Sequence, residues 1–173
     1  MTTMLVSTGV TFPDSTTQTT AAGANSTVVQ IKNYQTGAYA STTTKTPNDD
    51  TIPQITEGAE FMNLAFTPTS ATNRLMIEIV VNTTYQQTNL ITIALFLNTT
   101  ANSIAAVGNY QVANHPTSTG FNHNMVAGST SELTFRVRCG ANGTDRLDFN
   151  GAYGSRKRGG VAASGITITE YEV

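Results

Sequence analysis

The sequence predicts an all-β protein, a single antiparallel β-sandwich of jelly-roll type with an extended N-terminal arm. Apolar and polar residues alternate along most of the chain after residue 25, which is the period of strands with one buried face. Turn-forming clusters separate these runs at regular distances, and no stretch has the period of about 3.6 residues that marks a helix. Short loops are therefore expected between the strands, as in sandwiches and jelly rolls.

The chain divides into an arm or adaptor at residues 1–25 and one β-sandwich domain at residues 26–173. A length of 173 residues suffices for one buried core and is too short for two cores and an arm. Within the arm, Val10 and Phe12 alternate with polar neighbours, and Pro13 fixes φ just before turn-forming residues. The arm is therefore expected to hold a short strand, a tight turn and a second extended segment.

Six runs in the domain have the residue pattern of strands. In chain order they cover residues 29–31, 61–66, 75–81, 90–97, 133–139 and 166–172. The run 90–97 is apolar on both faces and is expected in the centre of a sheet, whereas 133–139 carries arginines on a face that is expected to contact water. Residues 101–107 could form one helical turn at most.

The composition is typical of a lattice or fibre protein and differs from that of an ordinary enzyme. Charged residues are 12% of the chain, about half of the roughly 25% in average globular domains. Threonine and asparagine supply the polarity instead, and threonine favours strands while its hydroxyl packs against a neighbouring subunit without desolvation of an ion. The net charge of -2 creates no field that would attract nucleic acid or an anionic membrane, so neither is expected as a partner.

The common enzyme motifs are absent from the sequence. It holds no phosphate-binding GxxxxGK[ST], no GxSxG, no HExxH and no pair of cysteines, so we expect neither catalytic residues nor a cofactor. Cys139 is the only cysteine and lies in an alternating apolar run, which indicates a small core residue. No apolar run approaches the roughly 20 residues of a membrane span, and the first residues lack a secretory pattern, so export is not expected.

Two kinds of metal site were weighed against structural roles. His115 and His123 could bind a metal across a trimer axis, but His123 alternates with apolar residues and is better explained as a half-buried strand residue bonded to a carbonyl. Calcium is conceivable at either of two oxygen-rich groups, for which turn capping is the favoured role. These groups are Asp49, Asp50, Glu57 and Glu60, and Asp145, Asp148 and Asn150. No metal site is predicted.

Arg156, Lys157 and Arg158 form the one basic cluster of the sequence and are flanked by glycines. The cluster either contacts something anionic, such as an acidic patch on a capsid subunit or an acidic surface glycan, or forms a solvated hairpin tip. Tyrosines near the predicted loops could stack on sugars. They are Tyr34, Tyr39, Tyr85, Tyr110 and Tyr153.

The stretch VTFPDSTTQTTAA, residues 10–22, resembles the VTFPDGTTQTTAA motif of tail-fibre and other virion structural proteins of tailed bacteriophages, with Ser15 in place of the glycine. Residues 34–38, 49–58, 67–75 and 160–170 resemble a module found in phage and prophage structural proteins. The resemblance implies a virion component without a shared catalytic site. It further implies a β-sandwich that assembles, as a trimer, on the outside of a phage.

We therefore expect a non-enzymatic protein of the phage particle surface, made in the bacterial host cytoplasm. The expected form is a homotrimeric capsid decoration, or cement, protein whose arms bind the major capsid protein or another virion protein, three linked arms raising the effective concentration of each. The residues expected to dock are Leu5, Val6, Val10, Phe12 and Pro13. The alternative is a tail-fibre or receptor-binding tip module that recognises host surface polysaccharide. A polysaccharide-degrading tip is disfavoured, because nothing in the sequence shows that carboxylates converge.

Overall fold

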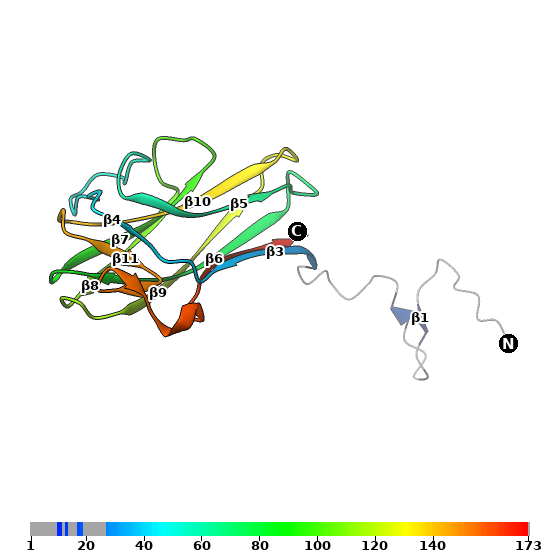
Figure 1. The fold of residues 1–173 in the computed structure, drawn as a ribbon. Helices are drawn as coiled ribbons and strands as arrows, with labels where there is room; N and C mark the ends of the chain where they lie inside the picture. The colour runs from blue at the N-terminus through cyan, green and yellow to red at the C-terminus, as the bar shows by residue number, and fades with distance from the viewer. Residues whose placement is uncertain (1–9, 12, 14–16, 19–26, 173) are drawn as a thin grey trace.

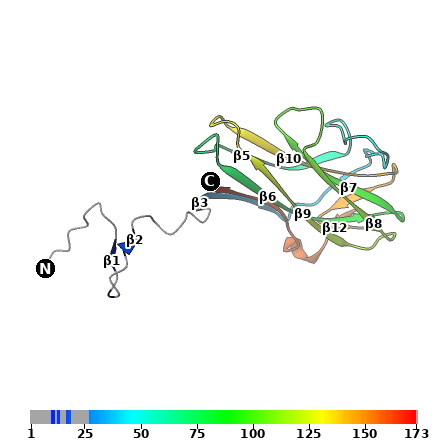
Figure 2. The ribbon, with the colours of Figure 1, turned by 180° about the vertical axis from the view of Figure 1, so that it is seen from behind.

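Two β-sheets pack face to face around one apolar core (Figures 1 and 2). The computed structural model describes residues 10–11, 13, 17–18 and 27–172. Strand pairs in both sheets are antiparallel. The all-β sandwich predicted from the alternating pattern is thereby confirmed.

The first sheet has four strands in the order β5–β10–β7–β8. These are β5 (Ala59–Phe66), β10 (Leu133–Ala141), β7 (Asn89–Leu97) and β8 (Ala105–Gln111). Strand β7 lies between two neighbours and buries residues 91–96 without interruption, as its continuous apolar run predicts. Strand β10 buries alternate residues and keeps Arg136 and Arg138 half-buried on its other face, where both approach Glu60.

The second sheet has six strands, built on the long strand β6 (Arg74–Tyr85). One edge of β6 pairs with β9 (Thr117–Val126). The other edge pairs first with β14 (Ser164–Tyr171) and then, from Thr83 onward, with β11 (Leu147–Phe149). Beyond these, β3 (Val28–Thr36) pairs with β14 and β4 (Ala40–Thr42) pairs with β11. The C-terminus therefore lies beside the start of β3 (Figure 1).

We define the seam as Asn82, Asn150 and Ser164, where β14 gives way to β11. One backbone bond remains here, from the Asn150 N–H to the Asn82 carbonyl at 3.0 Å, and side chains supply the other bonds. The Asn82 backbone N–H donates to Ser164 Oγ at 2.9 Å, and that hydroxyl donates to Asn150 Oδ1 at 2.7 Å. Asn150 Nδ2 donates to the carbonyls of Thr36 and Ala38. These polar groups are thereby satisfied although the ladder is interrupted.

The core is filled by the inward-facing residues of both sheets. On β6 the side chains of Leu75, Ile77 and Ile79 are buried, whereas Glu78 and Val80 on the opposite face are exposed. Cys139 is also buried, which confirms its prediction as a small core residue, and this burial raises the pKa of its thiol. Phe61 stacks on Phe149 across the two sheets with ring centroids 4.7 Å apart.

Among the described residues, the charged Glu170 has no exposed surface. The carboxylate of Glu170 on β14 accepts hydrogen bonds from Gln30, Thr69, Ser70 and Asn73. Burial alone would raise its pKa, but the bonds from Gln30, Asn73 and Thr69 outweigh burial and hold the pKa below its ordinary value. The carboxylate fastens β3 and the loop between β5 and β6 to β14.

Several short or polar elements differ from the sequence-based expectations. Residues 105–107, considered as part of a helical turn, begin strand β8, because their backbone groups pair with β7 in register from Leu95. Strands β12 (Gly151–Ala152) and β13 (Ser155–Arg156) form a small hairpin, followed by a single turn, η1 (Arg158–Gly160). Over the described ranges, no helix has the length and apolarity to span a membrane.

Candidate functional site

The predicted docking arm is only partly within the described residues. Leu5, Val6 and Phe12 lie outside them. Strand β1 (Val10–Thr11) pairs antiparallel with β2 (Thr17–Gln18), and Pro13 is exposed in the turn between them. This agrees with the expected strand, turn and second extended segment, while the docking role of these residues remains a prediction.

The basic cluster begins at the end of the β12–β13 hairpin. Arg156 ends β13, Lys157 follows it, and Arg158 opens η1. Lys157 Nζ donates to Ser155 Oγ at 2.8 Å and lies 5.6 Å from the ring centroid of Tyr153. Across the described part of the chain, no carboxylate pairs with any of the three cations, although Arg136, Arg138 and Arg146 each have one.

Arg158 adopts a backbone conformation that ordinary side chains rarely occupy. Its φ is 50°, and the next two residues, Gly159 and Gly160, have φ of 62° and 91°. A left-handed conformation costs a non-glycine residue about 1 kcal/mol, and glycine would avoid that cost. The turn thus holds an arginine at a position where the backbone alone favours glycine.

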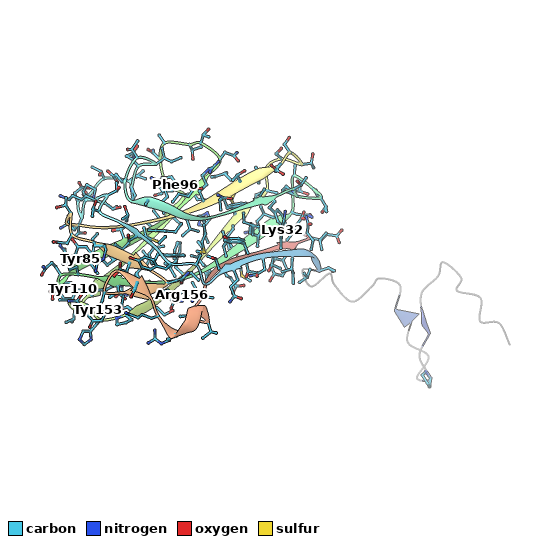
Figure 3. All side chains as sticks on the ribbon, in the orientation of Figure 1. Lys32, Tyr85, Phe96, Tyr110, Tyr153 and Arg156 are labelled. Carbon is cyan, nitrogen blue, oxygen red and sulfur yellow. The ribbon has the colours of Figure 1, made fainter. Side chains whose placement is uncertain are left out.

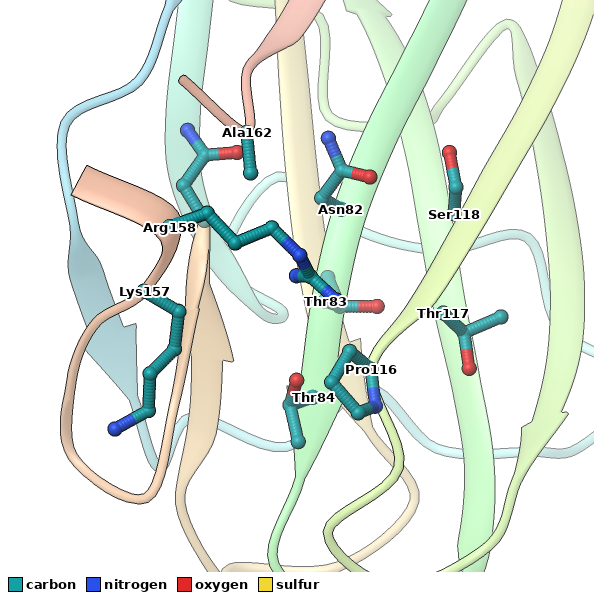
Figure 4. Close-up of a pocket in the computed structure, with 11 residues that line it drawn as sticks. Asn82, Thr83, Thr84, Pro116, Thr117, Ser118, Lys157, Arg158 and Ala162 are labelled. Carbon is teal, nitrogen blue, oxygen red and sulfur yellow. The ribbon is translucent and has the colours of Figure 1, made fainter. Parts of the chain in front are cut away.

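A pocket of about 290 Å³ opens beside this turn, next to the seam (Figure 4). Its floor is the outer face of the β6–β9 ladder, with Asn82, Thr84 and Ser118, and its wall is the segment after β13, with Lys157 and Arg158. Figure 4 shows the Arg158 side chain extending across the pocket, whereas the Lys157 ammonium group points away. Arg156 is not among the lining residues.

The Thr84 hydroxyl has no hydrogen-bond partner among the described residues, although the residue is only 1% exposed. A buried hydroxyl left unpaired costs about 1–3 kcal/mol. In Figure 4 its oxygen faces the Arg158 guanidinium group. The proximity of Thr84 and Arg158 could not be predicted from the sequence, because 74 positions separate them and only the fold brings the turn after β13 beside β6.

The lining of this pocket is neutral or basic and rich in groups that both donate and accept hydrogen bonds. It holds two cations, no Asp or Glu, and hydroxyl or amide groups from six residues. These six are Asn82, Thr83, Thr84, Thr117, Ser118 and Asn150. Such a lining suits a small, hydroxylated ligand with a negative charge.

A second candidate surface is the strand β3, at the edge of the six-stranded sheet. Within the described residues it pairs only with β14, so its other edge is open over nine residues. Val28, Val29 and Tyr34 are exposed on it, and Ile31 is 63% exposed. Figure 3 shows Lys32 of β3 far from Tyr85, Tyr110 and Tyr153, which lie toward the other end of the sandwich. A long open edge with exposed apolar side chains is a ready surface for pairing with another chain.

The oxygen-rich groups weighed as calcium sites are engaged in turns and ion pairs. Asp49 accepts from the N–H and hydroxyl of Thr51, bonds that lower its pKa, and Glu57 accepts from the Gln54 N–H. Glu60 pairs with Arg136, and Asp148 pairs with Arg146. In the described ranges, no three His, Cys, Asp or Glu residues gather as a metal site would require.

The histidines and tyrosines are distributed over the surface and the core. His123 is half-buried on β9, as expected, but forms no hydrogen bond to a carbonyl of the described chain, and His115 is exposed in a loop. Tyr85 is fully buried, so it cannot stack on a sugar, whereas Tyr110 and Tyr153 are well exposed. Burial also raises the pKa of Tyr85.

Comparison with known proteins finds similar strand arrangements and no family. No family model matches the chain, and no curated protein matches it in sequence. The C-terminal domain of EclA, a sugar-binding protein, has a TM-score of 0.40 and 14% identity, over 76% of this chain and 84% of that one.

Two viral structures are also similar. VP2 of the infectious bursal disease virus subviral particle gives a TM-score of 0.41 and 12% identity over 83% of this chain, which spans 33% of the VP2 chain. The enzymatically active domain of tailspike protein 4 of bacteriophage CBA120 gives 0.26 and 14% identity, over 71% of this chain and 19% of that one. These similarities do not identify a function.

Proposed function

We propose that this chain is a non-enzymatic structural protein of a phage particle surface, a homotrimeric decoration or cement protein anchored by its arm at residues 1–25. The phage-type motif at residues 10–22 and the low charge support this proposal. The observation that carries it is the edge of β3, which is open within the described residues and exposes four apolar side chains, because such an edge is a template for pairing with another chain.

Strand β3 supplies the contact between copies in this proposal. Proteins that keep such an edge free of partners place charges on it, and β3 carries one charged residue, Lys32, among nine. Ile31→Lys puts a second cation next to Lys32 on the exposed edge and should convert a trimer into monomers in light scattering coupled to gel filtration. Val112→Lys is the matched control, since Val112 is 53% exposed but lies outside β3. A monomeric wild-type chain, or equal masses for both variants and wild type, would refute assembly through β3.

The arm supplies the contact with the particle. A chain lacking residues 1–22 should remain a folded trimer and should no longer co-sediment with particles that were produced without the protein. Alanine at Leu5, Val6, Val10, Phe12 and Pro13 should have the same effect, whereas alanine at Thr2, Thr3 and Thr8 should retain binding. Decoration by the truncated chain would show that the arm does not dock.

Glycan recognition, as in a receptor-binding tip module, is a second candidate function. The pocket beside Arg158 favours it, because a concave site with convergent hydroxyl, amide and cationic groups is typical of ligand binding. Saturable binding of the isolated chain to host cells or their polysaccharide would support this candidate, and its absence would leave the structural function alone.

A further inference from the structure

The pocket beside the seam combines a cation without a partner, an unpaired buried hydroxyl and a neutral polar floor. We propose that it binds a single carboxylated sugar unit, such as a hexuronate, whose carboxylate pairs with Arg158 and whose hydroxyls bond to Asn82, Thr84 and Ser118. This inference rests on glycan recognition, the second proposed function, and does not depend on how the chain is anchored to a particle.

The volume of the pocket limits the ligand to about one sugar residue. At about 290 Å³ it lies at the lower limit of small-molecule pockets, which span roughly 300–1,000 Å³. The pocket opens to solvent beside exposed Pro116 and Ser118, so the rest of a polysaccharide chain can continue outside. The site would therefore recognise one sugar residue of a longer polysaccharide.

The position of Arg158 indicates that the ligand carries a negative charge. Its guanidinium group extends across the pocket and makes no hydrogen bond or ion pair with the described chain, so its donors are free for a ligand. Arginine offers a planar pair of N–H donors that matches both oxygens of a carboxylate. With no acidic residue in the lining, nothing in the pocket competes for that group.

The unpaired polar groups on the floor of the pocket indicate that the ligand carries hydroxyl groups. Thr84 Oγ1 lacks a partner, and neither the Asn82 amide oxygen nor the Ser118 hydroxyl bonds to another described residue. Hydroxyl groups both donate and accept, so a sugar can satisfy all three groups at once. A sulfate or a fully ionised phosphate group would offer acceptors only, and the Asn82 amide oxygen would find no donor. An acidic side chain from a neighbouring protein would supply a carboxylate without hydroxyls.

Matched methyl glycosides test both halves of the inference. The full chain is titrated with methyl β-glucuronoside, methyl β-glucoside and acetate while amide shifts are followed by NMR. We expect the glucuronoside to bind at least about tenfold more tightly than either of the others, since it alone offers both the charge and the hydroxyls. The shifted amides should lie around residues 82–84, 117–118 and 157–162.

The variants separate the pocket from the rest of the basic cluster. Arg158→Gly keeps the fold, because glycine favours the φ of 50°, and should weaken glucuronoside binding at least about tenfold. Arg156→Ala removes a neighbouring cation that does not line the pocket and should bind as the wild type does. Thr84→Val, which is isosteric, should weaken binding of both glycosides.

Each contrary result has a distinct meaning. Equal binding of glucuronoside and glucoside overturns the carboxylate assignment but leaves glycan recognition standing. Failure of every sugar to bind overturns both. If Arg156→Ala and Arg158→Gly lose equal affinity for the glucuronoside, or if acetate binds as tightly as the glucuronoside, the site attracts anions without recognising a sugar. An acidic surface of a protein partner would then be the better candidate ligand.

Discussion

Replacing Glu170 with glutamine tests whether the buried carboxylate holds β3 and the β5–β6 loop to the sheet. Oε1 accepts from Thr69 and Asn73, and Oε2 accepts from Gln30 Nε2 at 2.6 Å. The new amide nitrogen must face one of these donors. It cannot be relieved by rotation of the Gln30 amide, because that group also donates to the Thr67 carbonyl.

The expected loss of stability on Glu170→Gln is that of the least costly orientation of the new side-chain amide. If the new nitrogen takes the place of Oε2, the charge-assisted bond from Gln30 is lost, which is worth about 1.5–3 kcal/mol. The Thr69 N–H, which also reaches Oε2 at 3.2 Å, keeps its 2.9 Å bond to Oε1. For a domain of this size, the melting temperature should then fall by about 4–12 °C. Glu78→Gln is the control, since Glu78 is exposed on β6, and its effect should stay within about 0.5 kcal/mol.

The same residue predicts how stability depends on pH. The pKa of Glu170 is lowered in the folded chain, so the unfolded chain binds the proton more readily. The stabilisation is complete above the ordinary pKa of 4.5 and is lost as pH falls through the lower folded pKa. Urea unfolding followed by circular dichroism should therefore show wild type and Glu170→Gln converging in acid. A gap that stays constant with pH, or a loss no larger than that of Glu78→Gln, would refute the reasoning.

Three further predictions concern the core and the seam. The thiol of Cys139 should be inert to thiol reagents in the folded chain and should react after unfolding in urea; rapid reaction of the folded chain would contradict its burial. Gly140→Ala would place a methyl group 2.8 Å from the Gly58 Cα, and unfolding should show a loss of about 1–3 kcal/mol that Gly108→Ala, with an ordinary 3.4 Å contact, does not share. Asn150→Gly should lower the free energy of unfolding by about 1–3 kcal/mol, because the hydrogen bonds of the side-chain amide are lost. Asn150→Ala should cost about 1 kcal/mol more, because φ is 54° at this position; equal melting temperatures of the two variants would exclude this backbone contribution.

The strands with strong hydrophobic patterns could be predicted from the sequence. Along β6, alternating aliphatic residues identify the buried face, and the continuous apolar run of β7 indicates its central position. By contrast, β8 and β9 are edge strands without a strong alternation of large aliphatic residues, and their structure depends on pairing with β7 and β6. Because this sequence pattern is weak, the expectation of at most one helical turn was wrong for the start of β8, and β9 was predicted only as a strand around His123.

Of the candidate site, only the positive charge could be predicted from the sequence. The basic cluster stands out in the sequence, but its three members have different surroundings: Arg158 extends across the pocket, Lys157 bonds to Ser155, and Arg156 lies outside the lining. That difference depends on the left-handed turn at residues 158–160. The outward direction of Thr84 follows from strand alternation, whereas its lack of a partner requires the packing of the loop above it.

One edge of β6 pairs first with β14 and then with β11. The segment that connects these two strands can vary in sequence, whereas the strands themselves maintain the sandwich. Residues 150–163 leave the sheet after β11 and return with β14, and Ala152 is the one apolar residue among them that is buried. Exchanges among residues 155–161 of this excursion, which lie between the seam residues Asn150 and Ser164 and are exposed or half-buried, should leave the ladders on either side intact while they reshape the wall of the pocket. The scaffold can thereby acquire a new specificity by replacement of one surface segment, without renewed selection for folding.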